Sequence, residues 1–482
     1  MNKFKLFVEN FIIYGIGGIV SKIVPFVMIP IITWIMPETE YFGISDMTGT
    51  LRSFASAIAL MGMYDALFRL FFEKDNDEYK KRICSTALVF NMLTSICVFI
   101  MMVLASKSLA RLFFHNIKYS YMVYIAAMGV LVGATNAIIS APTRMMNKRK
   151  VFLITNAISP ILAYSIAIPM LMKGYYVVAM PIAAVISGLV MEISFWVLNR
   201  EWFCLSKFDV KLLKQLLVLA VPLLPNFIIY WIFDSCDRIM ITNLLGIGFE
   251  GVYAVGAKLG LASQLINTAF AGGWQFFVFS TMREKDQREY NSKIYELLGV
   301  VSFIATALVC VISYKLLDIL FPEKYLEAYT VAPYLFLAPL LLILYQTGHS
   351  QFLVIKKTWP GVFILSSGAI VNIILNNVLI TRIGIEGAAI ATLLGYVVTC
   401  LVDLAVLTKC RLMKVSYRFL IVAVLMFVYF IGWRYGFHHR IIIGLIAWAV
   451  YTIISLFIYR EDFLKIIRHI RRMSKNIVGG EN

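Results

Sequence analysis

The chain has 482 residues, of which 61% are hydrophobic and 15% are charged, and it carries a net charge of +17. A soluble domain averages about 45–50% apolar and about 25% charged residues, so this composition excludes an ordinary soluble protein and predicts a polytopic membrane protein. The mean hydropathy of +0.82 agrees with this. The basic excess alone would suit a nucleic-acid binder, but its distribution along the chain indicates membrane topology instead, and we expect no nucleic-acid partner.

Long apolar runs recur along the whole chain. A transmembrane helix needs about 20 apolar residues, and fourteen runs are long enough. They cover residues 8–35, 41–68, 83–106, 119–142, 151–172, 175–198, 213–244, 251–279, 294–320, 329–354, 361–381, 384–408, 417–433 and 441–459. The sequence therefore predicts an all-α integral membrane protein with fourteen transmembrane helices. The first run is too long for the core of a signal peptide, so we expect it to be retained as a span.

The Lys and Arg residues outside the spans are distributed unevenly. They concentrate before the first run and in every second connection after it, whereas the alternate connections carry few. Because loops rich in Lys and Arg stay in the cytoplasm, both termini are predicted to be cytoplasmic. The longest outer connection, roughly Lys107 to Lys118, is too short to house a catalytic domain.

Two short motifs recur at a nearly constant offset. Gly43–Ser45 opens the second predicted span and Gly251–Tyr253 opens the eighth, 208 residues on, while Gly174 corresponds to Gly384, 210 residues on. Weak internal symmetry of this kind is common in transporters. Each half holds six spans, an even number, so both halves enter the membrane from the same side. We expect parallel repeats related by an axis along the membrane normal, with a cleft between two lobes.

The repeat divides the chain into three parts. Residues 1–205 are predicted to form an N-lobe with spans one to six, 206–410 a C-lobe with spans seven to twelve, and 411–482 two further spans and a basic cytoplasmic tail. Within the tail, apolar and basic residues alternate at helical spacing from Arg460 to Lys475. This pattern predicts an amphipathic helix on the membrane surface, and a solvated basic tail is the alternative.

Four basic side chains fall inside the apolar runs: Lys22, Arg52, Arg238 and Lys258. A Lys or Arg at the centre of a transmembrane helix costs about 2.5–3.5 kcal/mol on insertion scales. Charge that is kept inside a span therefore indicates a functional site, with a polar cavity or a counter-charge beside it. These four residues are the candidate substrate-binding cations.

Lys22 and Arg52 lie deepest in their spans. Gly18 shares a helix face with Lys22, and Gly49 shares one with Arg52, so both faces leave room for a ligand or a close neighbour. Two cations in facing spans would form an anion-binding patch in the cleft, and Arg suits bidentate recognition of phosphate. The alternative is that Asp46, Asp65, Glu192 or Asp403 neutralises them in the interior of a lobe.

Arg238 and Lys258 lie nearer the outer ends of spans seven and eight. Asp234 lies one turn before Arg238 and Asp237 is adjacent to it, so we expect an ion pair within this span. Asp234 and Asp237 are also candidates for ion coupling, because acids in spans commonly mark H+ or Na+ relays. Apart from such a coupling ion, we expect no cofactor and no metal.

The remaining polar residues in the spans indicate packing rather than chemistry. Asn372, Asn376 and Asn377 in span eleven are typical of hydrogen bonds between helices, and His349 in span ten is read as a packing histidine. The sequence contains no nucleotide-binding loop and no nucleophile motif, so we expect neither an enzyme nor ATP-driven transport. Movement of a substrate would be passive or driven by an ion gradient.

Several stretches together carry a resemblance to a known family. They are Pro37–Gly43, Met61–Arg69, Asp237–Arg238 followed by Gly246 and Gly251–Tyr253, and Asn372–Ala391. In these the chain resembles bacterial polysaccharide flippases, the O-antigen and capsule repeat-unit transporters of the multidrug/oligosaccharidyl-lipid/polysaccharide superfamily. The resemblance extends over essentially the whole chain. It implies a MATE-like fold, with two pseudo-symmetric six-helix lobes in a V shape around a central cavity and two extra C-terminal helices.

The resemblance also implies a function. Such a protein would move an undecaprenyl-pyrophosphate-linked oligosaccharide from the cytoplasmic to the outer leaflet of the bacterial cytoplasmic membrane by alternating access. Lys22 and Arg52 suit the role of cavity cations that attract the pyrophosphate. The implied partners are the lipid-linked oligosaccharide, membrane lipids and the glycan polymerase machinery.

Other transporters and envelope proteins are alternatives. A flippase for the peptidoglycan precursor lipid II would need similar cations, whereas a cation-coupled multidrug antiporter of the same superfamily would want acids deepest in the cleft. A major-facilitator transporter would carry a Gly-Asp-Arg-Gly-type signature between spans two and three. The corresponding loop here, Phe71 to Arg82, lacks such a signature. A polymerase component would show a large outer loop or acidic catalytic pairs, and the sequence has neither.

Overall fold

The computed structural model describes residues 23–260, 262–264, 266, 270, 274, 278, 286–355, 357 and 359–462. These residues form helices joined by short connections, and no β-strand occurs among them. Nine of the described helices are long and apolar enough to cross a membrane, or up to eleven if each of two bent pairs counts as one span. The all-α membrane fold is confirmed. Lys22 and most of the predicted tail helix lie outside the described residues.

The first lobe contains seven helices after the apolar helix Ile23–Ile35. They are α2 (Thr39–Leu60), α3 (Met63–Phe71), α4 (Asp77–Leu104), α5 (Ser106–Phe114), α6 (Ser120–Met145), α7 (Arg149–Met172) and α8 (Ala179–Asn199). The outer connection predicted between Lys107 and Lys118 is therefore largely the short helix α5. Its buried Phe113 and Phe114 explain why it packs on the lobe rather than forming an open loop.

Beyond residue 205, the part of the chain that the structure describes contains eight further α-helices. They are α9 (Val210–Ala220), α10 (Leu224–Leu244), α11 (Ile247–Gly260), α13 (Gln287–Leu320), α14 (Ala332–Val354), α15 (Trp359–Lys409), α16 (Tyr417–Gly432) and α17 (Ile441–Ile458). The helix α15 covers predicted spans eleven and twelve, and its backbone leaves helical geometry at Ile383 and Gly384, where the sequence places the break. These bounds are consistent with the predicted fourteen spans.

Two corners of the fold repeat each other. Gly174, between α7 and α8, has a φ of +87°, and Gly384, at the break in α15, has a φ of +65°. Both angles lie in the left-handed region, which glycine adopts without a steric cost. The two glycines are 210 residues apart and make equivalent turns, which supports the predicted duplication.

Predicted span seven is split into two helices that pack on different lobes. Asp209 caps α9 by accepting hydrogen bonds from the amides of Lys211 and Leu212. Asp209 also pairs with Arg82 of α4, and α9 packs against α3 and α4. Between α9 and α10 the chain passes through a short 3₁₀ turn, Val221–Leu223, that contains a proline. We call the end of the molecule where α9 meets α3 and α4 the linker end.

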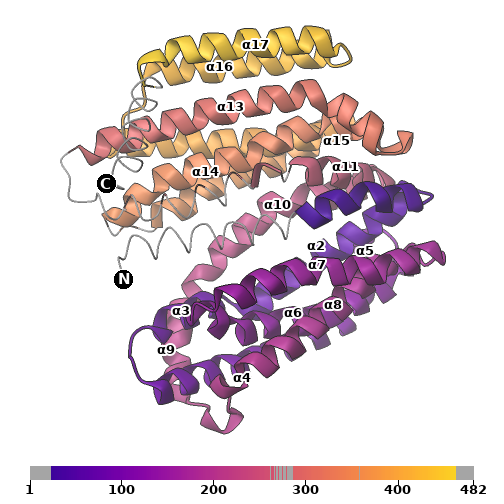
Figure 1. Ribbon diagram of the computed structural model, residues 1–482, viewed down its shortest axis with the longest axis vertical. Coiled ribbons are helices and arrows are strands. Elements are labelled where there is room, and N and C mark those ends of the chain that lie inside the picture. The colour runs from indigo at the N-terminus through magenta and orange to yellow at the C-terminus, as the bar shows by residue number, and fades with distance from the viewer. Residues whose placement is uncertain are drawn as a thin grey trace, which may run out of the picture.

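At the opposite end, α2 and α11 cross in close contact. A Cβ added to Gly43 would lie 2.2 Å from the Ile247 carbonyl oxygen, and one added to Gly251 would lie 2.1 Å from the Thr39 carbonyl oxygen. Only glycine allows backbones to approach this closely. The two glycines are the repeat-related pair found in the sequence. We call this the crossing end, and Figure 1 shows α2 and α11 side by side there, between the two lobes.

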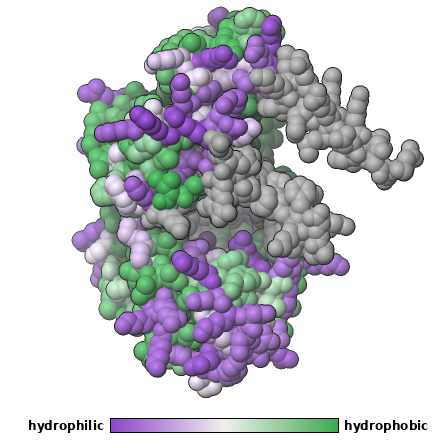
Figure 2. Space-filling view, turned by 90° about the vertical axis from the view of Figure 1, so that its left-hand side faces the viewer, coloured by the Kyte–Doolittle hydropathy of each residue, from purple (hydrophilic) through white to green (hydrophobic). Residues whose placement is uncertain are grey.

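The helices α16 and α17 lie on the outside of the second lobe, against α13 (Figure 1). Figure 2 views the molecule from the linker end and shows hydrophilic side chains gathered over both lobes on this face. A polar end face of this kind suits a helical protein whose sides are in lipid and whose ends reach water.

Candidate functional site

A cavity of about 810 Å³ lies between the two lobes. Residues of α2, α6, α7 and α8 line it on one side and residues of α10 and α11 on the other, together with the helix Ile23–Ile35. Pockets that bind small molecules are typically about 300–1,000 Å³, so this cavity has the size of a ligand-binding pocket. Of the four candidate cations, Arg52, Arg238 and Lys258 line this cavity. Ile23 and Pro25, which follow Lys22 in the sequence, also line it.

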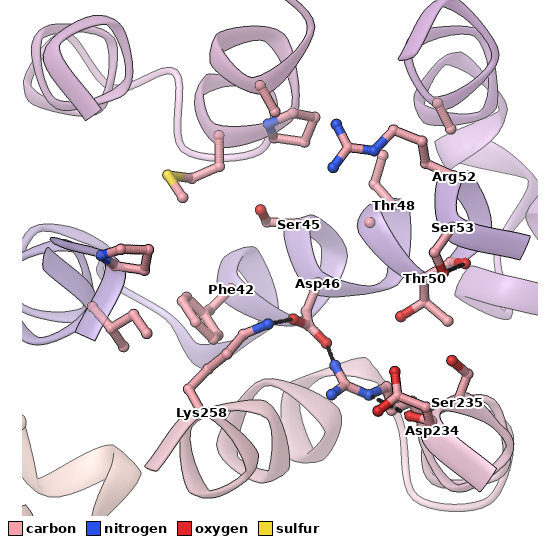
Figure 3. A pocket seen from close by; sticks show the side chains of 18 of the residues that line it. Phe42, Ser45, Asp46, Thr48, Thr50, Arg52, Ser53, Asp234, Ser235 and Lys258 are labelled. Atoms are coloured by element: carbon pink, nitrogen blue, oxygen red, sulfur yellow. Dashed lines mark hydrogen bonds and ion pairs between the residues drawn. The ribbon is translucent and has the colours of Figure 1, made fainter. Parts of the chain in front are cut away.

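Asp46 of α2 binds two of these cations from the other lobe. Lys258 Nζ lies 3.0 Å from Asp46 Oδ1, and the guanidinium of Arg238 contacts Oδ2. The Asp46 side chain is only 8% exposed and that of Arg238 only 10%. Both pairs are visible as dashed lines at Asp46 in Figure 3. In such a poorly hydrated place, leaving one charge without its partner is strongly destabilising, by about 3–5 kcal/mol.

The expected ion pair within span seven is not what the structure shows. Arg238 Nε donates a hydrogen bond of 3.3 Å to the backbone carbonyl of Asp234, and its charge is paired with Asp46 instead. Asp237 points elsewhere, because neighbouring residues of a helix do not face each other. Its carboxylate accepts hydrogen bonds from the Tyr253 hydroxyl and, at 3.3 Å, from the Thr392 hydroxyl.

Asp237 belongs to a buried polar network inside the second lobe. Asn372 donates to the Thr392 hydroxyl at 3.1 Å, and Asn376 donates to Asn372 at 3.3 Å. Only the first of these bonds joins two predicted spans, because Asn372 and Thr392 lie on opposite sides of the break in α15, whereas Asn376 and Asn372 lie on the same helix. The other coupling candidate, Asp234, lines the inter-lobe cavity. The two acids therefore lie in different surroundings, one facing the cavity and one facing the lobe interior.

Arg52 differs from the other two cations because no acid among the described residues holds it. Within the described ranges it has neither an ion pair nor a hydrogen bond, although it is only partly exposed. Figure 3 shows its guanidinium pointing into the cavity, away from the Asp46 carboxylate. Asp46, one of the four acids that the sequence offered as a neutralising partner, is occupied by Arg238 and Lys258. Arg52 is therefore a cation available to an anion entering this cavity.

Gly129 of α6 makes room for the Arg52 side chain. A Cβ at position 129 would lie 2.5 Å from Arg52 Cδ and 3.3 Å from Cγ. A Cβ at Gly133, one turn further along the same helix, would meet nothing nearer than the Ser56 hydroxyl at 3.8 Å. The aliphatic part of Arg52 thus runs over a bare backbone surface.

This close contact gives a testable expectation. Gly129→Ala should displace the Arg52 side chain and lower substrate transport several-fold without changing any charge, because the added methyl occupies the space of Cδ. Gly133→Ala is the matched control and should leave transport near that of the parent protein. Transport by both variants is measured in vesicles at equal protein content. Equal rates for both variants would show that the position of Arg52 is unimportant.

Sequence reasoning missed three residues of this site: Asp46 as the bridge between lobes, Gly129 as the seat of Arg52, and Glu250. Glu250 of α11 is fully buried at the crossing end, and neither of its carboxylate oxygens has a hydrogen-bond partner among the residues that the structure describes. A carboxylate inside an apolar run is a signal that could have found Asp46, whereas Glu250 lies just before the run that begins at residue 251. No sequence signal could have found Gly129, whose role depends on which helices are neighbours.

A family model described as polysaccharide biosynthesis protein matches residues 36–330. No curated protein matches the chain significantly. Among solved structures, the lipid II flippase MurJ in an inward closed conformation has 16% identity and a TM-score of 0.69, and the match covers 94% of this chain and all of MurJ.

Transporters of the MOP superfamily share the fold as well. A multidrug resistance MATE transporter in an outward-facing conformation has 14% identity and a TM-score of 0.60, with 84% of this chain and 95% of that chain covered. A MOP superfamily transporter from Pyrococcus furiosus, described as having a binding pocket of reverse polarity, has 14% identity and a TM-score of 0.52 over the same shares. These likenesses establish a MurJ-like and MATE-like fold.

Proposed function

Because the chain belongs to the family of polysaccharide biosynthesis proteins, we propose that it flips an undecaprenyl-pyrophosphate-linked oligosaccharide repeat unit from the cytoplasmic to the outer leaflet. Its fold is that of flippases and transporters, and it is a multi-pass membrane protein. The proposed membrane is the bacterial cytoplasmic membrane. The step involves no covalent chemistry, only movement of an anionic, sugar-bearing headgroup.

The observation that carries this proposal is Arg52, which has no ion pair within the described part of the chain and lies in a cavity between two lobes. A pyrophosphate and its sugars lose their water when they enter hydrocarbon, and burying such groups without partners is prohibitively costly. A cation that no carboxylate of the described chain neutralises replaces part of that hydration. Arg presents a planar fork of donors that matches phosphate oxygens in pairs. The hydroxyls of α2 that line the same cavity, such as Ser45 and Thr48, suit the sugars.

Alternating access supplies the proposed movement. The sequence topology puts the linker end in the cytoplasm with both termini, which makes the crossing end the outer end. The close approach of Gly43 and Gly251 then closes the outer end, so the headgroup would enter from the cytoplasmic side. The lipid tail would remain in the membrane while the lobes rock about the cavity.

Coupling to an ion gradient is part of the proposal. Asp234 faces the headgroup cavity, and Asp237 belongs to the polar network with Tyr253 and Thr392. Binding of H+ or Na+ at either acid would change the electric field around Arg238. The glycan polymerase machinery is the proposed partner that receives the product. Neither proposal needs a bound metal or organic cofactor.

A lipid II flippase is the second candidate, and one observation favours it. The likeness to MurJ covers 94% of this chain, whereas the likeness to the multidrug transporter covers 84%. Fold alone does not determine function, so the family match keeps the repeat-unit carrier ahead. A multidrug antiporter is disfavoured because a cationic drug would meet the positive charge of Arg52.

The substrate class is tested in vesicles that contain the purified protein. One set carries an undecaprenyl-pyrophosphate oligosaccharide, a second carries lipid II, and a third is loaded with a cationic dye. We expect the first lipid to reach the opposite leaflet, as reported by an enzyme or lectin added outside, and the dye to stay in place. Faster movement of lipid II would favour the second candidate, and dye movement without lipid movement would overturn the proposal.

A further inference from the structure

Asp46 joins the two lobes through charge. It lies on α2, whereas its partners Arg238 and Lys258 lie on α10 and α11. Among the described residues, no other ion pair connects the helices α2–α8 with the helices α10–α17. Separation of α2 from α10 and α11 would therefore have to break both of these pairs.

The ion pairs lie next to the backbone crossing that closes one end of the cavity. Asp46 comes one helical turn after Gly43, whose backbone packs against Gly251. Lys258 comes two turns after Gly251 on α11. The Asp46–Lys258 pair and the glycine crossing thus act on the same two helices, α2 and α11, and the Asp46–Arg238 pair ties α2 to the neighbouring α10. All three contacts favour the closed arrangement.

Arg238 and Lys258 are at the same time part of the cavity wall that Arg52 faces. Each Asp46 carboxylate oxygen contacts one of the two cations, which is the arrangement that two oxygens of a phosphate would adopt. A phosphate group at this wall would compete with the Asp46 carboxylate, because both cannot bind Arg238 and Lys258 at the same time.

We infer that Asp46 is an internal competitor for the anionic headgroup and a latch on the crossing end. In the empty protein its carboxylate holds Arg238 and Lys258 and keeps α2 against α11. A pyrophosphate drawn in by Arg52 takes over these two cations, Asp46 is released, and the crossing can open. This inference rests on the proposed function and adds to it the device by which the substrate opens its own exit. A ligand can shift a conformational equilibrium only through such differential binding.

A disulfide between α2 and α11 reports the closed crossing. A Cβ at Gly248 would lie 3.2 Å from the Thr39 hydroxyl oxygen, so Thr39→Cys with Gly248→Cys places two thiols within bonding reach. The pair is made in a protein whose seven native cysteines are replaced by serine or alanine. The rate of disulfide formation on mild oxidation then measures how often the crossing is closed.

The first arm of the experiment contains no ligand. Asp46→Asn keeps the size of the side chain and removes its charge, and we expect disulfide formation to slow by about 5- to 150-fold, the usual range of coupling between linked sites. Asp46→Glu keeps the charge and should stay near the parent rate. Asp318→Asn is the charge-matched control, because it removes a carboxylate of α13 that lies outside the cavity and pairs with Lys315 of the same helix. A parent-like rate in a folded Asp46→Asn protein, as judged by gel filtration, overturns the latch.

The second arm adds undecaprenyl pyrophosphate as the probe. We expect it to slow disulfide formation in the parent protein and to have little further effect in Asp46→Asn. If the probe binds the parent in a separate binding assay but leaves the disulfide rate unchanged, the competition is overturned while the proposed function stands. If the probe does not bind at all, both the proposed function and the competition fail. The difference in disulfide rate between the parent and Asp46→Asn without ligand then still decides whether Asp46 is a latch.

Discussion

Replacing Arg52 with Gln is expected to lower transport of the lipid-linked oligosaccharide by about 10- to 150-fold. Arg52 is the cavity cation that no described carboxylate neutralises, so its charge is available to the headgroup. A hydrogen bond to a charged group contributes about 1.5–3 kcal/mol, and each 1.4 kcal/mol is a factor of ten in rate or affinity. Arg52→Lys should recover only part of the activity, since an ammonium group cannot bind two phosphate oxygens in the planar manner of a guanidinium.

The measurement is the accumulation of lipid-linked sugars in the cytoplasmic leaflet of a deletion strain that expresses each variant. Arg111→Gln is the matched control, because Arg111 is an exposed residue of α5 in the same lobe. It should support full export. If Arg52→Gln reaches the membrane at parent levels and exports glycan at the parent rate, the cavity does not work through this charge.

Replacing Glu296 with Ala is expected to give the largest loss of stability outside the cavity. Glu296 of α13 is buried, and its carboxylate accepts hydrogen bonds from the Ser416 amide at 2.6 Å, the Ser416 hydroxyl at 2.7 Å and the Tyr459 hydroxyl at 2.7 Å. Ser416 precedes α16 and Tyr459 follows α17, so one carboxylate fixes an end of both added helices. Losing such bonds costs about 1.5–3 kcal/mol each when one partner is charged, although these three will not add fully.

Thermal unfolding of the purified protein in detergent checks this expectation. Asp318→Ala is the control on the same helix, since Asp318 is exposed and forms only a surface pair with Lys315, a type of contact that contributes about 0–1 kcal/mol. We expect a clearly lower Tm for Glu296→Ala and little change for Asp318→Ala. Equal Tm values for the two variants would show that the added helices are held by packing against α13 and not by this carboxylate.

Much of the fold could be predicted because membrane spans leave a simple signal. Most apolar runs match helix bounds to within a few residues, and the break at Gly384 appears where the sequence places it. The exceptions are α4 and α13, which begin six and seven residues before their runs, and predicted spans two and seven, each of which is divided into two helices. The offset between Gly43 and Gly251 also predicts symmetry, and the structure adds that these two glycines touch. Hydropathy and repeats can be read along the sequence because they do not depend on which helices become neighbours in the fold.

The pairing of charges could not be predicted in the same way. Arg238 was expected to pair with Asp234 or Asp237 because they are near in sequence, but its partner is Asp46, 192 positions earlier in the chain. Which helices face each other across the cavity depends on how the lobes pack, and no sequence period encodes it. For the same reason Arg52 could be placed in a cavity by its depth, while its lack of an acidic partner and its seat on Gly129 required coordinates.

The most direct test of the central claim is the affinity of the purified protein for undecaprenyl pyrophosphate, compared between the parent and Arg52→Gln in lipid nanodiscs. We predict tight binding by the parent and a loss of affinity of at least about tenfold in the variant, with undecaprenol, which has no phosphate, binding weakly to both. Equal affinity of parent and variant for the pyrophosphate would contradict the account.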